Sequence, residues 1–217
     1  ACFGSGNGAK VLLDQLSTET RISAEDLAQQ ATCIRPAIAV HYRGAKLWVP
    51  GAPSAAGLGV AHTLATLELE GAPVAPTGIE TVQRMARAIG ATVEVRGKPF
   101  LRDLFTDGFS DSFVARGQAM RSTTDHIAPG YPTHISTVDA SGNAVSITHS
   151  LGETAGVTLG ESGVIINNFL GESDVNPPFL QRPAGARLIT MCCPSILELP
   201  DGRIIPLGAG GSSRIPT

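Results

Sequence analysis

Alternation of apolar and polar positions predicts three β-hairpins along the chain. In each hairpin, two stretches with a period of two flank residues that favour a tight turn, such as Arg43-Gly44 in the first of them. The paired stretches are Ala37–Tyr42 with Lys46–Val49, Thr133–Val138 with Val145–Thr148, and Ser195–Leu199 with Arg203–Leu207. A shorter apolar stretch in 160–168 predicts one more strand, which ends in Asn167-Asn168.

Helical signals lie mostly before residue 130. We expect a helix over Ala9–Leu16, a second one capped by Ser23, and a long one over about Ser54–Leu69. Thr77 and Glu80 have the spacing of a capping box, which predicts a fourth helix ending at Gly90. Its expected core face is Ile79, Val82, Ala86 and Ile89.

The stretch from Lys98 to Ala119 is predicted to be irregular, with Phe100, Leu101, Leu104, Phe105 and Phe113 as apolar anchors. The polar stretch 118–131 is expected to form an exposed loop that leads into the central hairpin. Helices before residue 130 and hairpins after it indicate the α/β or α+β class.

Composition excludes several functions. A chain of 217 residues with net charge -3 and pI ≈ 5.9 has no basic field for nucleic acid. No apolar run approaches the roughly 18 residues that span a bilayer, so we expect no membrane partner. The start of the chain lacks a signal-peptide pattern. The compartment stays open between cytoplasm and a periplasmic or secreted form after signal removal.

No metal or cofactor site is predicted. Asp103, Asp107 and Asp111 lie four residues apart, but solvated acids explain this spacing better than metal ligands do. Cys192 and Cys193 are adjacent, and no cysteine spacing fits a zinc site. We therefore expect reduced cysteines that pack as small hydrophobic residues.

The central hairpin carries the strongest functional motif. It reads Pro132-Thr-His-Ile-Ser136, then Asp139, then Gly142-Asn-Ala-Val145. This pattern resembles the start of the small subunit of the γ-glutamyltransferases, a family of N-terminal nucleophile hydrolases. In that family the first residue of the motif is Thr, which is both the self-cleavage site and the nucleophile. Here that position holds Pro132.

Further strings resemble the same family in the same order. They are Tyr42-Arg43-Gly44, the Pro- and Ser-rich turn 50–57, the string 160–168, Pro183–Ser195 and Gly208–Ile215. The family places an oxyanion hole at the last of these, since adjacent glycines let backbone amides converge on an anion. A Ser pair that binds substrate carboxylate in the family is replaced here by Ile189-Thr190.

The resemblance implies the αββα layering of N-terminal nucleophile hydrolases, and we expect it to be incomplete within these 217 residues, because the family's segments before and after the matched region have no counterpart here. Residues 1–131 correspond to the C-terminal portion of a mainly helical large subunit. Residues 132–217 correspond to a small-subunit portion made of hairpins, and both form one structural domain. We expect a homo-oligomer, or a partner chain that completes the sheets.

The resemblance also assigns site residues. Gly210 and Gly211 would form the oxyanion loop, and His134 would be a structural support. The residues expected to contact the substrate are Ser150, Glu153, Glu172 and Thr190. Asp174 is the alternate to Glu172. The expected ligand is a γ-glutamyl compound or a similar small amide, and no cofactor is implied.

Pro132 leaves three readings open, because proline has no hydroxyl and locks φ near roughly -65°. The first is an unprocessed protein of the family with reduced or altered activity. In the second, Thr133 acts as a shifted nucleophile, although a one-residue slip turns a strand side chain to the opposite face. The third is a non-catalytic binding or assembly homologue, or a subunit fragment.

Overall fold

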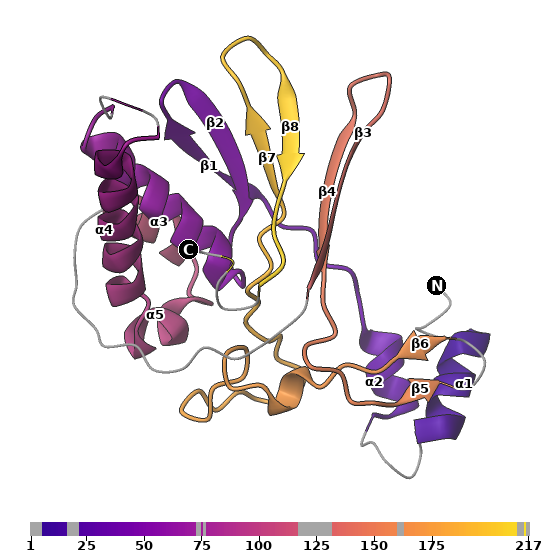
Figure 1. Cartoon of the computed structure of the whole chain (residues 1–217). Helices are drawn as coiled ribbons and strands as arrows, with labels where there is room; N and C mark the ends of the chain where they lie inside the picture. The colour runs from indigo at the N-terminus through magenta and orange to yellow at the C-terminus, as the bar shows by residue number, and fades with distance from the viewer. Residues whose placement is uncertain are drawn as a thin grey trace.

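The computed structural model describes residues 6–16, 22–72, 75, 77–116, 132–159, 163–211 and 215. In these residues a four-stranded antiparallel sheet carries helices on one face, a two-stranded hairpin stands beside the sheet, and a small lobe lies apart from both (Figure 1). The mixture of helices and antiparallel sheets confirms the α+β class. The loop expected at 118–131 lies outside the described residues. Every described helix is too short or too polar to cross a membrane.

The main sheet joins the first and the last predicted hairpin. It contains β1 (Ala37–Tyr42), β2 (Ala45–Pro50), β7 (Ser195–Glu198) and β8 (Ile204–Leu207), in the order β1-β2-β7-β8. The turn between β1 and β2 uses Arg43 and Gly44, with φ of 54° and 80°. Because β2 pairs with β7, segments about 150 residues apart share one sheet. Both predicted hairpins are confirmed.

Helices cover the face of this sheet to which Val40, Leu47 and Val49 point. The helix α3 (Ala55–Leu69) packs on β1 and β2. It begins where Ser54 Oγ accepts the Gly57 N–H at 2.9 Å, as a side-chain cap does.

The expectation of an irregular stretch from Lys98 was wrong. The segment forms α5 (Lys98–Asp103) and α6 (Phe109–Arg116), two short helices separated by a turn. Phe100 and Leu104 are buried in the same core as α3, as anchoring residues should be, and Phe100 contacts the ring of Phe113. Propensity missed these helices because tertiary burial of two aromatic anchors stabilises them.

The fourth helix, α4 (Ile79–Val95), differs from its prediction in three ways. Its N-cap is Gly78 without a side-chain cap bond, and it continues past Gly90. The buried residues are Arg84, Ala88 and Thr92, whereas Ile79 is 74% exposed. Three of the four residues of the predicted apolar face, Ile79, Val82 and Ala86, are therefore exposed, and Ile89 is half-buried.

Hydrogen bonding explains the orientation of α4. Thr92 Oγ1 lies 2.9 Å from His62 Nδ1 and 2.7 Å from Thr63 Oγ1, both on α3. The Arg84 guanidinium donates to Glu70 and to the Gly71 carbonyl at the end of α3. Buried polar groups need such partners, so this polar face docks on α3.

The central hairpin consists of β3 (Thr133–Val138) and β4 (Ala144–His149), which pair over six positions as predicted. Asp139 organises the turn, since its Oδ1 accepts N–H groups from Ser141 and Asn143 at 2.9 Å each. The hairpin lies beside β8, and Ser146 Oγ donates to the Leu207 carbonyl at 2.9 Å.

The small lobe combines α1 (Asn7–Leu16), α2 (Ala24–Gln29), β5 (Thr158–Leu159) and β6 (Val164–Ile165). Ser23 is the N-cap of α2 as predicted, and it forms a capping box with Asp26 that was not predicted. Leu12 and Leu159 are the buried centre of this lobe, which has its own small core. The chain leaves it through residues 30–36 and through the 3-10 helix η2 (Phe169–Gly171).

Candidate active site

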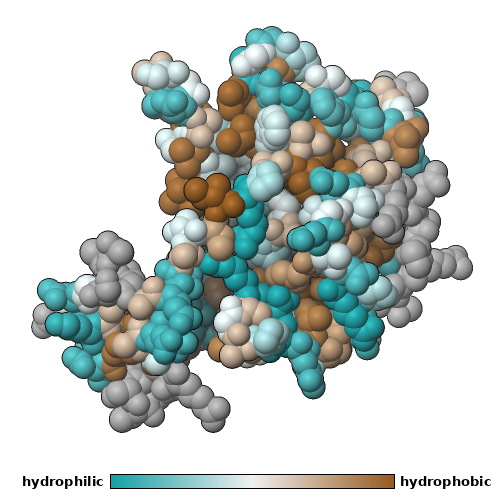
Figure 2. Space-filling model, turned by 180° about the vertical axis from the view of Figure 1, so that it is seen from behind, coloured by the Kyte–Doolittle hydropathy of each residue, from teal (hydrophilic) through white to brown (hydrophobic). Residues whose placement is uncertain are grey.

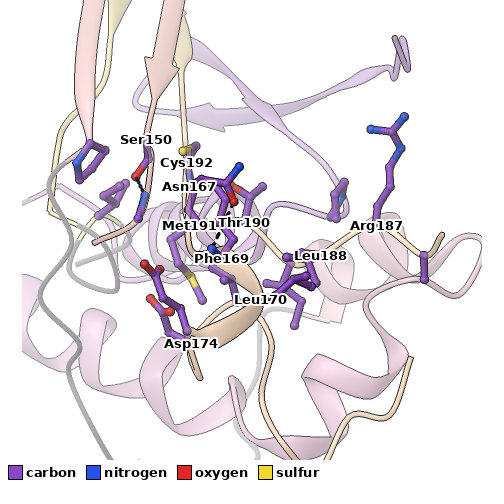
Figure 3. Close-up of a pocket in the computed structure, with 18 of the residues that line it drawn as sticks. Ser150, Asn167, Phe169, Leu170, Asp174, Arg187, Leu188, Thr190, Met191 and Cys192 are labelled. Atoms are coloured by element: carbon purple, nitrogen blue, oxygen red, sulfur yellow. Dashed lines mark hydrogen bonds between the residues drawn. The ribbon is translucent and has the colours of Figure 1, made fainter. Parts of the chain in front are cut away.

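A cavity of about 810 Å³ lies between the main body and residues at the edge of the small lobe. Its walls come from the start of β3, the segment after β4, the region around η2, and residues 185–192. Four of the substrate-contact residues that the sequence predicts line this cavity. They are Ser150, Glu172, Thr190 and Asp174, the last being the alternate to Glu172. Pro132 lines the same cavity. Figure 3 shows Ser150, Thr190 and Cys192 gathered at its centre, with the Asp174 carboxylate on one side.

Pro132 lies against the glycine loop that follows β8. A β-carbon at Gly210 would overlap the Pro132 carbonyl oxygen, and one at Gly208 would overlap the His134 ring. Only glycine permits such close approach of the two segments. The fold thus places the backbone of 208–210 directly at residue 132. Residues 212–214 of the predicted oxyanion string lie outside the described residues.

Thr133 does not line the cavity. Its side chain is exposed, and its Cα partner across the hairpin is His149. Pro132 and His134 are both half-buried, and neighbouring positions of a strand point to opposite faces. The hydroxyl nearest in sequence to the nucleophile position therefore sits on the wrong side of β3 for this cavity.

The ring of His134 makes two side-chain hydrogen bonds. Its Nδ1 lies 2.9 Å from Thr148 Oγ1 on β4, and its Nε2 lies 2.8 Å from Ser136 Oγ. These contacts tie the ring to both strands beside Gly208. This environment fits the structural role expected for His134.

Among the described residues, a backbone N–H and no cation holds the Glu172 carboxylate. Its Oε1 accepts the Glu153 N–H at 2.6 Å, and Asn168 Oδ1 accepts the same N–H at 2.9 Å. Gly152 has φ of 66° and no room for a β-carbon beside the Glu172 carboxylate. Glu153 thus contributes its amide, while its side chain is exposed and does not line the cavity.

Partial burial raises the pKa of Glu172 above its ordinary value of 4.5. The Glu153 N–H opposes this shift, and the negative charges of Asp174 and Glu153 add to it. A cationic group placed against such a carboxyl group stabilises its ionised form. The acidic side of the cavity therefore suits an ammonium group of a ligand.

Two hydroxyls mark the other side of the cavity. Thr190 Oγ1 accepts the Cys192 N–H at 3.1 Å, and Ser150 Oγ accepts the Gly152 N–H at 3.0 Å. Each oxygen keeps its own proton for donation to a ligand. Ile189 is 2% exposed and packs in the main core, so the first position of the altered Ser pair offers no polar group.

Sequence reasoning missed several residues that line the cavity. Asn167, Arg187, Met191 and Cys192 lie within the segments that resemble the family, but their sequence context predicts no role in a site. The Arg187 guanidinium donates to the Ala31 carbonyl at 2.6 Å and points away from the cavity centre (Figure 3). Behind Met191, the guanidinium of Arg96 lies 3.4 Å from its sulfur, and burial lowers the pKa of Arg96 to about 10.

No group of three or more His, Cys, Asp or Glu side chains with metal-binding geometry occurs among the residues that the structure describes. The three described cysteines are free, with Cys33 exposed and Cys193 buried. Burial raises the pKa of the Cys193 thiol. The expectation that cysteines pack as buried hydrophobic residues therefore fits Cys193 and fails for Cys33.

Glu172→Gln should raise the melting temperature at pH 7 relative to the native chain. The folded-state pKa of Glu172 is raised, so the unfolded chain ionises first and the free energy of unfolding falls as pH rises from about 4.5. Gln keeps an acceptor for the Glu153 N–H but carries no charge. Thermal melts from pH 4 to pH 8 test this.

The gain should become much smaller at pH 4, where the Glu172 carboxyl is mostly protonated in both the folded and the unfolded chain. Glu94→Gln, at an exposed position on α4 that does not line the cavity, is the matched control and should leave the melting temperature nearly unchanged. A gain that is constant across the pH range would contradict the charge-based account of Glu172.

The fold and the site together define a class. A solved structure of cephalosporin acylase from Bacillus halodurans superposes with a TM-score of 0.68 at 18% identity, over 95% of this chain and 40% of that one. A second solved structure matches equally well, with a TM-score of 0.68 over 97% of this chain. The fold is that of the N-terminal nucleophile hydrolases.

The family follows from the sequence comparison. Residues 2–217 match the Gamma-glutamyltranspeptidase family, and the chain belongs to this family. The glutathione hydrolase proenzyme of Pseudomonas aeruginosa is 28% identical over 99% of the chain. The Acylase ACY 1 proenzyme of Pseudomonas sp. strain SE83 is 28% identical over 89% of the chain. The chain spans 44% and 38% of the lengths of these two relatives.

Proposed function

We propose that this chain is an unprocessed γ-glutamyltranspeptidase-type protein that binds a γ-glutamyl compound or a similar small amide and turns it over slowly or not at all. One observation carries the proposal. Pro132 lines the cavity beside Gly210, where the family motif has its nucleophile, and proline offers no hydroxyl. The relatives that match are named proenzymes, so they are made as precursors, and a precursor that cannot cleave itself stays intact.

Ligand recognition rests on the two sides of the cavity. Glu172 and Asp174 suit an ammonium group, and the Ser150 and Thr190 hydroxyls suit an amide or a carboxylate. Ile189 in place of a hydroxyl weakens the carboxylate side, because a site built on hydrogen bonds loses much of its affinity when one is removed. A small amide other than glutathione is therefore compatible with the site.

Intact mass and ligand binding test this proposal together. Purified protein should give a single species, show no release of p-nitroaniline from γ-glutamyl-p-nitroanilide, and melt at a higher temperature with that compound or glutamine present. Glu172→Ala should remove the ligand-dependent shift. Spontaneous cleavage next to residue 132, with turnover, would overturn the unprocessed reading.

A second candidate function has one observation in its favour. The Pro132 carbonyl oxygen lies against the backbone of Gly210, in the loop that resembles an oxyanion hole. Thr133 Oγ could attack the Pro132 carbonyl carbon, transferring the acyl group from nitrogen to oxygen. Water would then hydrolyse the ester, leaving a Pro132 carboxylate and a free Thr133 amine as base.

The two candidates differ in the mass of the product. Self-cleavage between Pro132 and Thr133 gives fragments 1–132 and 133–217, and Thr133→Ala should abolish it while Thr133→Ser preserves it. After cleavage, the exposed side chain of Thr133 would still have to turn toward the cavity. The orientation of β3 therefore favours the unprocessed protein.

A further inference from the structure

His62 is a buried titratable side chain that lies outside the candidate active site. It belongs to the middle of α3, is 2% exposed, and contacts both α4 and α6. Its Nδ1 lies 2.9 Å from Thr92 Oγ1 on α4, and its ring centroid lies 5.3 Å from that of Phe113 on α6. Histidine is the side chain whose charge changes most readily near neutral pH, so a buried one makes its surroundings sensitive to pH.

Hydrogen bonding fixes the proton on this ring. The Thr92 hydroxyl donates to the Ala88 carbonyl at 3.0 Å, which uses its single proton. The Thr92 oxygen must then accept from the His62 Nδ1–H and, at 2.7 Å, from the Thr63 hydroxyl. The neutral ring therefore carries its proton on Nδ1, and Nε2 is the nitrogen that would take up a second proton in acid.

No acid holds a protonated His62 in the described part of the chain, where none of the ion pairs involves this ring. The sheet meets the helices with Val40, Leu47 and Val49, which carry no charge. The described charged or titratable side chains on α3 and on the elements packed against it are His41, Tyr42 and Lys46 on the strands, Glu68 and Glu70 at the end of α3, Glu80, Arg84, Arg87, Glu94 and Arg96 on α4, and Asp111 on α6. Burial lowers the pKa of His62 below its ordinary value of 6.5, and no charge offsets this effect.

The contact between α4 and α3 depends on polar groups. Of the three buried residues of α4, which are Arg84, Ala88 and Thr92, only Ala88 is apolar. An element that buries little apolar surface opens at a low free-energy cost. A positive charge on His62 would be buried without an anion, and separation of the two helices would return that charge to water. Protonation therefore favours the separated state.

Both helices also support one wall of the cavity in the candidate active site. Thr92 and Arg96 lie one turn apart on the same face of α4, and Arg96 Nη2 donates to the sulfur of Met191 at 3.4 Å. Met191 lines the cavity. At the start of α3, the Ser54 hydroxyl donates to the carbonyl of Cys192, the next residue of the same wall, at 2.8 Å. Each helix thus gives this wall one contact, and the contact from α4 lies a single turn from the partner of His62.

The supported wall belongs to the main body of the molecule. Figure 2 shows the small lobe standing apart from the main body and joined to it through a narrow connection. The helices α3 and α4 lie side by side in the main body, on the far side from the small lobe (Figure 1). Met191 is among the side chains that Figure 3 draws around the cavity. A change at the contact between α3 and α4 therefore reaches the cavity from behind this wall.

We propose that protonation of His62 loosens α4 from α3 and withdraws Arg96 from Met191, so that this wall of the cavity is firm near neutral pH and loosened in mild acid. The sign follows from proton binding. The separated state takes up the proton near pH 6.5 and the docked state only at lower pH, so docking weakens as the pH falls through that window. One proton changes the docking equilibrium by at most about tenfold per pH unit. The inference concerns the chain without ligand, so it does not depend on the proposed function.

Hydrogen exchange and NMR of the full chain between about pH 5 and pH 7.5 test the proposal, above the range in which ordinary carboxyl groups titrate. Exchange at each amide is compared with that of an unstructured peptide at the same pH. From pH 7 to pH 5, protection of the α4 amides should fall at least about fivefold, while protection of the β2 amides should change less than about twofold. The ε-methyl signal of Met191 should shift with the same midpoint, because Arg96 leaves its sulfur.

Two matched variants assign the effect to one histidine. His62→Asn keeps an amide N–H that can donate to Thr92 but takes up no proton in this range, so its α4 protection and its Met191 signal should not depend on pH. His41→Asn makes the same change at an exposed position on β1 and should keep the pH dependence of the native chain. Should His62→Asn fail to fold, His62→Gln replaces it, since glutamine also carries an amide and no titrating group.

Four results would overturn the proposal. The first is α4 protection in the native chain that is equal at pH 5 and pH 7. The second is an equal fall in the His62→Asn protein, which would assign the effect to another group. The third is a fall that the β2 amides share, which would mean general unfolding instead of release of α4. The fourth is a fall without any movement of the Met191 signal, which would remove the link to the cavity.

Discussion

Pro132→Thr is expected to convert an intact chain into two fragments, one ending at residue 131 and one beginning at residue 132. The substitution supplies a hydroxyl on the residue that lies against Gly210 and lines the cavity. Attack by that hydroxyl on the preceding carbonyl, followed by hydrolysis of the ester, is the self-cleavage route of this nucleophile class. Cleaved product should rise from undetectable in the native chain to the majority of molecules.

Mass spectrometry of freshly purified protein and of protein after incubation measures this. The Pro132→Ser protein should also cleave itself. The Pro132→Ala protein should stay intact, because alanine removes the restriction that proline puts on φ but supplies no hydroxyl. Adding Thr133→Ala to Pro132→Thr should not stop cleavage. A Pro132→Thr protein that stays intact in both samples would show that more than the nucleophile has been lost.

Gly57→Ala is expected to destabilise the fold by about 2–3 kcal/mol, near the upper end for an overpacked site. Gly57 lies in the first turn of α3, and a β-carbon there would overlap the Pro50 carbonyl at the end of β2. The obstacle is backbone on both sides, so neither segment can yield without moving the helix off the sheet. The melting temperature should fall by roughly 5–10 °C.

Gly90→Ala is the matched control, because it makes the same change inside another helix. Nothing lies within 4 Å of a β-carbon at Gly90, so only helix propensity acts there. We expect a stabilisation of about 0.5–1 kcal/mol. Thermal melts of both variants should show a lower melting temperature for Gly57→Ala and a higher one for Gly90→Ala. Equal effects at Gly57 and Gly90 would contradict close packing of α3 on β2.

Replacing Gly57 would also disturb the site. The Ser54 hydroxyl donates to the Cys192 carbonyl at 2.8 Å, and the backbone of Ser54 forms an isolated parallel β-bridge with that of Thr190. The start of α3 therefore holds one wall of the cavity in place. A packing error there should weaken ligand binding as well as stability.

Much of the local structure was readable from the sequence. The hairpins appear where alternation and turn residues coincide, as at Asp139 and Gly142 in the central turn. Helix starts at Ser23 and Ser54 follow from side chains that satisfy the first free N–H groups. These features depend on residues a few positions apart, so a linear reading captures them.

The orientation of α4 was not readable. Its apolar stripe predicts a core face, yet Arg84 and Thr92 are buried because α3 and its C-cap Glu70 offer hydrogen-bond partners to them. Likewise α5 and α6 exist because Phe100 and Phe113 meet in a core built by distant segments. Periodicity describes a helix by itself, whereas burial depends on the neighbour.

The sequence by itself determined the family strings, the order of the hairpins and the absence of a hydroxyl at residue 132. Only the tertiary structure decided that Pro132 lies at the glycine loop, that Thr133 faces away from the cavity, and that Glu172 is held by the Glu153 amide. The physical reason is distance along the chain. Residues 132 and 210 meet because the hairpin β3–β4 lies beside β8, and glycine at 208 and 210 lets their backbones touch.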